Sequence, residues 1–186
     1  MKKNLLIASI LGSICLVCAL FIALIDIATK DKIAQNTKET ELAAIKEIFA
    51  NYDENKSESL EASGRINQKI LAKDKDNNEL GYLYNISGKN SYGSISLMVA
   101  VVDEKLYKVE LLENTQSFAS TVYSYFKTTY PSSPDTAIHV GAYGSTDVVV
   151  GSLSAGEVEN IDVSCGATFG AKLIRDLVLE ALEDER

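Results

Sequence analysis

LLIASILGSICLVCALFIALI, residues 5–25, is the stretch that decides how this chain is organised. All 21 residues are uncharged, and most are Leu, Ile, Val, Ala, Cys or Phe. A helix of this length spans about 31 Å, at about 1.5 Å per residue, which matches the apolar core of a bilayer. The stretch therefore predicts a transmembrane helix near the N-terminus.

The charges around this stretch predict its orientation. Lys2 and Lys3 precede the apolar residues, and positive residues flank the cytoplasmic end of membrane helices. We therefore expect a single-pass protein of the cell membrane, with a cytoplasmic N-terminus and an extracytoplasmic main domain.

The apolar stretch has two alternative interpretations. A cleaved signal peptide has an apolar stretch of about 7–15 residues that ends at a small-x-small site. Here the stretch is longer, and Asp26 follows it. Lipid modification at Cys15 or Cys18 is the second alternative, but the usual small residues precede neither cysteine. The length of the stretch favours an uncleaved anchor.

The composition after the anchor is that of an acidic, folded domain. The chain has 186 residues, 46% hydrophobic and 24% charged, with a net charge of −8. The first 26 residues carry +1, so residues 27–186 carry −9. An acidic domain is repelled by nucleic acid phosphates, and we expect no nucleic acid partner.

Cysteine and histidine are too few for a disulfide or a metal site in this domain. Cys165 is the only cysteine after the apolar stretch, and His139 is the only histidine. An internal disulfide is therefore excluded outside the membrane, and the residue pattern predicts no metal site.

The first half of the domain is expected to hold one helix and a β-rich centre. Residues 37–50 carry apolar residues at helical spacing and are expected to continue the anchor; these are Leu42, Ile45, Ile48 and Phe49. Residues 51–64 are polar and predict a loop. Short apolar runs at 81–87, 95–102 and 106–112 predict strands. The last two are joined by a hairpin-length connection, residues 103–105.

The second half is expected to hold two helices and a further strand. Residues 117–130 predict a helix that ends before Pro131. Its apolar side would contain Phe118, Val122, Tyr125 and Phe126. Residues 146–150 predict a strand.

The clearest helix of the domain starts at Thr168. Apolar residues follow the helical period along one face; these are Ala171, Ile174, Leu177, Val178, Ala181 and Leu182. We predict an α+β fold. Its parts are the cytoplasmic tip and anchor (1–28), a juxtamembrane helix and polar loop (29–64), and one extracytoplasmic domain (65–186).

Residues 162–168, DVSCGAT, lead into this last helix. Small residues around Gly166 allow a bulky group to approach the backbone. The N-terminus of a helix also favours an anion such as phosphate. By itself the pattern is more typical of Thr168 as a helix cap, which contributes about 1 kcal/mol.

The motif Asp162-x-x-Cys165-Gly166-Ala167-Thr168 resembles the flavinylation motif of FMN-binding domains, Asp-x-x-(Ser/Thr)-Gly-Ala-Thr. These domains occur in the G subunit of Rnf electron-transport complexes and in the C subunit of the sodium-pumping NADH:quinone oxidoreductase. In that family a flavin transferase joins FMN to the last threonine through a phosphoester. The resemblance therefore implies covalent FMN on Thr168. The order of anchor, domain, motif and last helix is also similar.

Other segments extend the resemblance, and some depart from it. Residues 113–116 stand where the family often has Glu-Thr-Pro-Gly near the flavin, which implies roles in binding for Glu113 and Thr115. Residues 92–95 resemble the Gly-rich start of the family's central sheet. Cys165 replaces a Ser or Thr, and Phe169 is also unusual; it would pack either on the flavin or in the core.

The resemblance implies an electron-carrying subunit of an Rnf-type, ion-translocating oxidoreductase complex. Its partners would be other membrane subunits of that complex and the flavin transferase. The flavin carries the redox chemistry, so the chain needs no catalytic residues of its own. Two alternatives stay open: a stand-alone tethered flavoprotein in extracellular electron transfer, and a cofactor-free tethered binding domain in which Thr168 only caps a helix.

Overall fold

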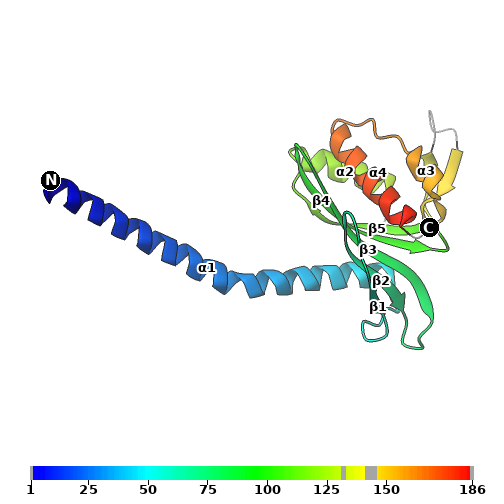
Figure 1. The fold of residues 1–186 in the computed structure, drawn as a ribbon. Helices are drawn as coiled ribbons and strands as arrows, with labels where there is room; N and C mark the ends of the chain where they lie inside the picture. The colour runs from blue at the N-terminus through cyan, green and yellow to red at the C-terminus, as the bar shows by residue number, and fades with distance from the viewer. Residues whose placement is uncertain (1, 131–132, 141–145, 185–186) are drawn as a thin grey trace. The chain divides into compact units, whose positions relative to one another are not determined.

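A computed structural model describes residues 2–130, 133–140 and 146–184 of the chain. Its contacts separate two units, one up to Thr40 and a compact one from Glu41 onward. One helix, α1 (Lys2–Ile48), contributes to both units (Figure 1).

The described side chains of the first unit suit a lipid environment. Large apolar residues from Ile10 to Ile27 are all exposed, and Ile27 is 70% exposed. The helix is long and apolar enough to cross a membrane. A helix that is hydrophobic on every side needs an apolar environment, which suggests a membrane anchor. The predicted fold class, an N-terminal apolar helix before an α+β domain, is confirmed.

The compact unit is built on a five-stranded antiparallel sheet in the order of the sequence. Its strands are β1 (Glu58–Leu60), β2 (Ile66–Lys73), β3 (Glu79–Asn90), β4 (Gly93–Val102) and β5 (Lys105–Asn114). The three predicted strands are confirmed as parts of β3, β4 and β5. The prediction of a loop over 51–64 was wrong in part, because β1 lies inside that segment, and β2 was not predicted.

Two-residue turns join the central strands. Asp103 and Glu104 connect β4 to β5 with φ values of 52° and 61°, as in the type I′ turns that fit the twist of a hairpin. Between β3 and β4, Asn90 pairs with Gly93 across a turn that contains Tyr92.

The inner strand β4 is buried on both faces of the sheet. Ile95, Leu97, Val99 and Val101 belong to one hydrophobic core, whereas Met98 and Ala100 belong to the other. Successive side chains of a strand point to opposite faces. The apolar run of β4 therefore requires a cover on each side.

The end of α1 covers one of these faces. Ala44, Ile45, Ile48 and Phe49 are buried against the sheet. The Phe49 ring stacks on Tyr107 of β5 with ring centroids 5.4 Å apart. The prediction that a helix over 37–50 continues the anchor is thus confirmed.

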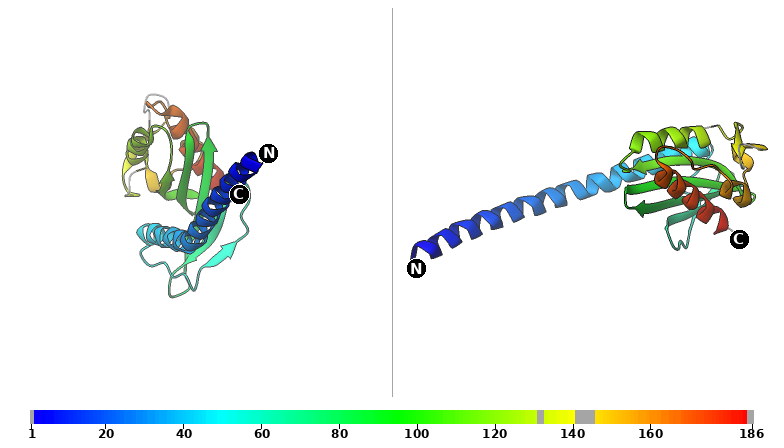
Figure 2. Two further views of the ribbon diagram at one scale, coloured as in Figure 1. Left: turned by 90° about the vertical axis from the view of Figure 1, so that its left-hand side faces the viewer. Right: turned by 90° about the horizontal axis from the view of Figure 1, so that it is seen from above.

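Helix α4 (Thr168–Glu183) covers the opposite face, with α2 (Ala119–Thr129) beside it (Figure 2). A Cβ on Gly170 would come within 2.5 Å of Val122 Cγ2, so glycine allows the two helices to approach closely. All six residues predicted for the apolar face of α4 are buried.

The prediction for α2 was correct in extent but partly wrong in its face. Val122 and Phe126 are buried, whereas Phe118 is the N-cap residue and is exposed, and Tyr125 is half-buried. The predicted stop at Pro131 lies outside the described residues. Smaller elements complete the domain: β6 (Ala137–Val140), β7 (Thr146–Val149), the 3-10 helix η2 (Val150–Ser152) and α3 (Ala155–Glu159). Of these, only the strand at 146–150 was predicted.

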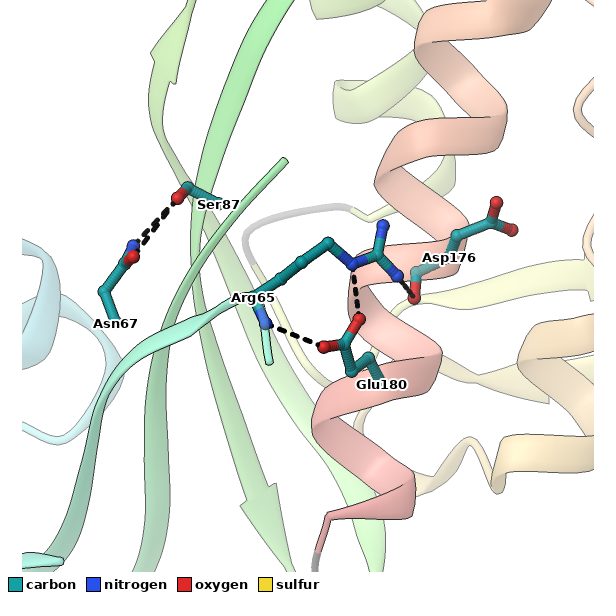
Figure 3. A network of polar contacts seen from close by, with 5 residues as sticks. All are labelled: Arg65, Asn67, Ser87, Asp176 and Glu180. Carbon is teal, nitrogen blue, oxygen red and sulfur yellow. Dashed lines mark hydrogen bonds and ion pairs between the residues drawn. The ribbon is translucent and has the colours of Figure 1, made fainter. Parts of the chain in front are cut away.

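Polar contacts also tie α4 to the start of β2 (Figure 3). The backbone N–H of Arg65 donates to Glu180 Oε1 at 3.0 Å, and its guanidinium forms an ion pair with the same carboxylate. Arg65 Nη2 also donates to the carbonyl oxygen of Asp176 at 3.4 Å. These groups are partly exposed, so the ion pair is expected to contribute at most about 1 kcal/mol. Apolar burial therefore contributes more than this ion pair to the packing of α4 on the sheet.

We predict that Ile48→Ala destabilises the compact unit by about 2–5 kcal/mol, because it removes a buried side chain and leaves a cavity. Lys46→Ala, on the exposed side of the same helix, should change the free energy of unfolding by less than about 0.5 kcal/mol. Urea unfolding of the full chain in detergent, followed by near-UV circular dichroism of its tyrosines, measures both. Equal stability of the two variants would contradict a core that includes the end of α1.

Candidate functional site

Thr168 is the first residue of α4, and its side chain is exposed. The N-cap position is occupied by Ala167, with φ −130° and ψ 48°, and no side chain caps the helix. The Thr168 hydroxyl instead donates to the carbonyl oxygen of Cys165 at 2.7 Å. Thr168 is therefore a helical residue with an accessible hydroxyl and does not act as the cap.

The first turn of α4 presents unused hydrogen-bond donors. The N–H groups of Gly170 and Ala171 both donate to the Ala167 carbonyl oxygen, at 2.9 and 3.1 Å. Within the described part of the chain, no acceptor meets the N–H groups of Thr168 and Phe169. Free N–H groups and the helix dipole favour an anion at this end.

The residues before Thr168 form a series of tight turns. Asp162 Oδ1 accepts the Ser164 N–H at 2.8 Å. The N–H and hydroxyl of Ser164 hold the pKa of Asp162 below its usual value, because they stabilise the carboxylate. Cys165 Sγ accepts the Ala167 N–H at 3.4 Å. Asp162 and Cys165 thus shape the backbone that leads to Thr168.

A pocket of about 270 Å³ opens beside Thr168. Its lining comes from three separate segments: Tyr92, Gln116, Phe118, Val122 and residues 166–170. Three aromatic rings around it are unusually exposed, at 43% for Tyr92, 60% for Phe118 and 63% for Phe169. We call this space the aromatic pocket.

Gly166 lines the aromatic pocket and lies close to Thr121 of α2. A Cβ at Gly166 would lie 3.5 Å from the nearest atom, Thr121 Cγ2, which is an ordinary contact. The position therefore tolerates a small side chain, while a larger one would extend into free space.

The turn between β3 and β4 contacts the loop that follows β5. Gly93 has a φ of 140°, and a Cβ there would lie 2.3 Å from the Thr115 carbonyl oxygen, so a side chain is excluded. Thr115 Oγ1 accepts the Ser94 N–H at 2.8 Å, and the Ser117 N–H donates to the Tyr92 carbonyl oxygen at 2.8 Å. These bonds bring residues 92–95 and 113–117 together.

The structure places the predicted site residues in three groups. Gly166, Ala167, Thr168 and Phe169 line the aromatic pocket. Asp162 and Cys165 lie behind it and line a neighbouring cavity instead. Glu113 and Thr115 line neither cavity: Glu113 is exposed and pairs with Ser96, and Thr115 bonds Ser94. Their roles in flavin binding stay predictions.

The neighbouring cavity, of about 580 Å³, lies between α2 and residues 161–165. Hydroxyl groups dominate its helical wall: Thr121, Ser124, Tyr125, Thr128 and Thr129. Burial raises the pKa of Tyr125 to about 12, so its hydroxyl stays protonated at neutral pH. This cavity offers polar contacts but no ionised group except the Asp162 carboxylate.

Sequence reasoning missed five residues of the aromatic pocket: Tyr92, Gln116, Phe118, Val122 and Gly170. Each lay in a segment that the sequence had singled out for another reason. The signal available for Tyr92 was its place beside Gly93, between two apolar runs. For Phe118, the spacing within the predicted helix pointed to the core instead. Among the side chains that the structure describes, no group of three His, Cys, Asp or Glu is arranged to hold a metal; the His139 side chain is not among them.

Comparison with known proteins identifies the N-terminal part of the chain. Residues 1–48 match the family model of the RnfG N-terminal region. No curated protein matches the chain. The match covers the apolar stretch and the helix that continues it. It does not include the motif at 162–168. Over residues 1–48 the resemblance to the RnfG subunit is confirmed, and it supports a subunit of an Rnf-type membrane complex.

Proposed function

We propose that this protein is an electron-carrying subunit of an Rnf-type, ion-translocating oxidoreductase complex, with FMN joined to Thr168 by a phosphoester. The observation that carries this proposal is the exposed Thr168 hydroxyl, at the first turn of α4 and on the edge of the aromatic pocket. The match of residues 1–48 to the RnfG N-terminal region supports the complex.

The residues at this site suit a phosphate ester. A phosphate on Thr168 Oγ would lie next to the free N–H groups of Thr168 and Phe169, at the positive end of the α4 dipole. Esterification replaces the hydroxyl hydrogen with phosphorus, so the hydrogen bond to Cys165 is lost. That loss costs about 0.5–1.5 kcal/mol, and hydrogen bonds from the N–H groups to a charged phosphate are of comparable or greater strength.

The pocket suits the apolar part of a flavin. Its aromatic rings and the Val122 side chain offer apolar contact, and its glycines leave the backbone accessible. Bound FMN would supply the electron-accepting and electron-donating chemistry. The chain would hold the group, keep it near the surface and prevent its loss by diffusion.

The anchor determines where in the cell this chemistry would take place. The apolar part of α1 would hold the domain at a membrane, and the two N-terminal lysines favour an extracytoplasmic domain. A covalent bond suits that location, because a cofactor that dissociated outside the cytoplasm would not be recovered.

We predict that the chain co-expressed with a flavin transferase gives a flavin-fluorescent band on a denaturing gel, and that Thr168→Ala abolishes it. Removal of the hydroxyl removes the only side-chain atom of residue 168 that could form the ester. Thr128→Ala is a matched control, because its hydroxyl also donates to a carbonyl oxygen three to four residues earlier, that of Ser124. Intact mass of the protein from its native host checks the same modification.

A fluorescent band that persists in Thr168→Ala would contradict the attachment of FMN at Thr168. A colourless wild-type protein would favour the cofactor-free alternative.

A second prediction concerns the space around the attachment point. Gly166→Leu should lower the fraction of flavin-labelled protein, because a bulky side chain two residues before Thr168, at a position that lines the aromatic pocket, would crowd the approach to the attachment point. Gly156→Leu in α3 is the control, since a Cβ there meets nothing within 4 Å. Flavin absorbance relative to protein in purified samples measures the fraction. Equal labelling of both variants would show that the pocket plays no part.

A further inference from the structure

Two aromatic side chains form one wall of the aromatic pocket. The rings of Tyr92 and Phe169 stack with centroids 5.2 Å apart and planes inclined by 25°. They come from distant elements, the β3–β4 turn and the first turn of α4. Stacked aromatic pairs of this geometry attract one another beyond the effect of their buried area. Both rings nevertheless stay largely exposed, so this wall has an apolar surface that no described part of the chain covers.

One amide, that of Asn90, holds this wall together. Asn90 Oδ1 accepts the Tyr92 N–H at 2.9 Å and the Gln116 Nε2–H at 3.2 Å. Its Nδ2 donates to the Phe169 carbonyl oxygen at 3.2 Å. All three partners line the aromatic pocket. Gln116 is itself buried, with 5% of its surface exposed.

We propose that the Tyr92–Phe169 pair is the platform on which the isoalloxazine ring of the bound flavin stacks, and that Asn90 is the residue that positions this platform. The inference rests on the proposed function, because Thr168 supplies the tether. Phe169 directly follows that attachment point, so a group on Thr168 is held at high effective concentration beside the wall.

The aromatic pocket is better placed for this ring than the neighbouring cavity, because Thr168 lines the first and not the second. The isoalloxazine is flat and largely apolar, and stacking on an aromatic face is the contact such a ring prefers. The neighbouring cavity carries the Asp162 carboxylate, and its one aromatic residue, Tyr125, is half-buried. Stacking on Tyr92 has an optical consequence, because tyrosine quenches the fluorescence of a flavin in contact by donating an electron to its excited state.

The test is the fluorescence of the flavin-loaded full chain in detergent, native and denatured. Tyr92→Phe keeps the shape of the ring but removes the electron donor, so native fluorescence should rise several-fold, while the denatured samples stay equal. Tyr123→Phe is the matched control, because Tyr123 is an equally exposed tyrosine on α2 that lines neither cavity. Phe169→Leu should weaken the visible circular dichroism of the flavin, measured per bound flavin.

Asn90 is tested separately from the rings. Asn90→Asp keeps an acceptor for Tyr92 and Gln116 but loses the donor to Phe169, and it should weaken the circular dichroism per bound flavin. Asn67→Asp is the control, since Asn67 bonds Ser87 on the sheet, and neither lines the aromatic pocket. An unchanged flavin signal in Asn90→Asp would overturn its positioning role.

The outcomes separate this inference from the proposed function. A labelled wild type whose native fluorescence is the same in Tyr92→Phe would overturn the platform alone. So would a rise in Tyr125→Phe and not in Tyr92→Phe, which would place the ring in the neighbouring cavity. A wild type without any attached flavin would overturn both proposals.

Discussion

Burial of β4 on both faces is the constraint on which the rest of the domain depends. Four side chains of this strand point into one core and two into the other, and all six are almost completely buried. A sheet with an apolar inner strand must be covered twice. The end of α1 provides one cover and α4 the other. The second cover also brings the first turn of α4 beside the β3–β4 turn, so the packing of the core sets the position of the site.

The sequence predicted the elements whose apolar pattern is regular. The strands within β3, β4 and β5, and the face of α4, follow a period that burial imposes directly. Strand β2 was missed because polar residues such as Asn67, Gln68 and Lys69 interrupt its pattern. Phe118 was assigned to the buried face of α2 by spacing alone. In the structure it precedes the helix, where helical spacing no longer determines which way a side chain points.

For the site, the sequence predicted the local chemistry and missed the surroundings. Small residues before a helix were enough to mark residues 162–168, because turns and helix ends have strong local signatures. The walls of the aromatic pocket are a tertiary property. Tyr92, Gln116 and Phe118 come from segments distant in the chain, and only the paired strands and the α2–α4 contact bring them to Thr168. Conversely, Glu113 was predicted for the site but does not line the pocket, whereas the nearby Gln116 does.

Helix α4 carries Phe169, which contacts Asn90, and Asn90 also contacts Gln116. The docking of α4 therefore completes the site, which has a consequence for the order of events during synthesis. Chains emerge from the ribosome N-terminus first, and α4 is the last element of this domain to be made. Until it docks, the apolar face of β3 and β4 has no cover, and nascent chains in that state are prone to associate with one another. The cavity beside Thr168 closes only when the final helix is in place. Any enzyme that recognises the assembled cavity would therefore act on chains in which α4 has docked and would not act on the others.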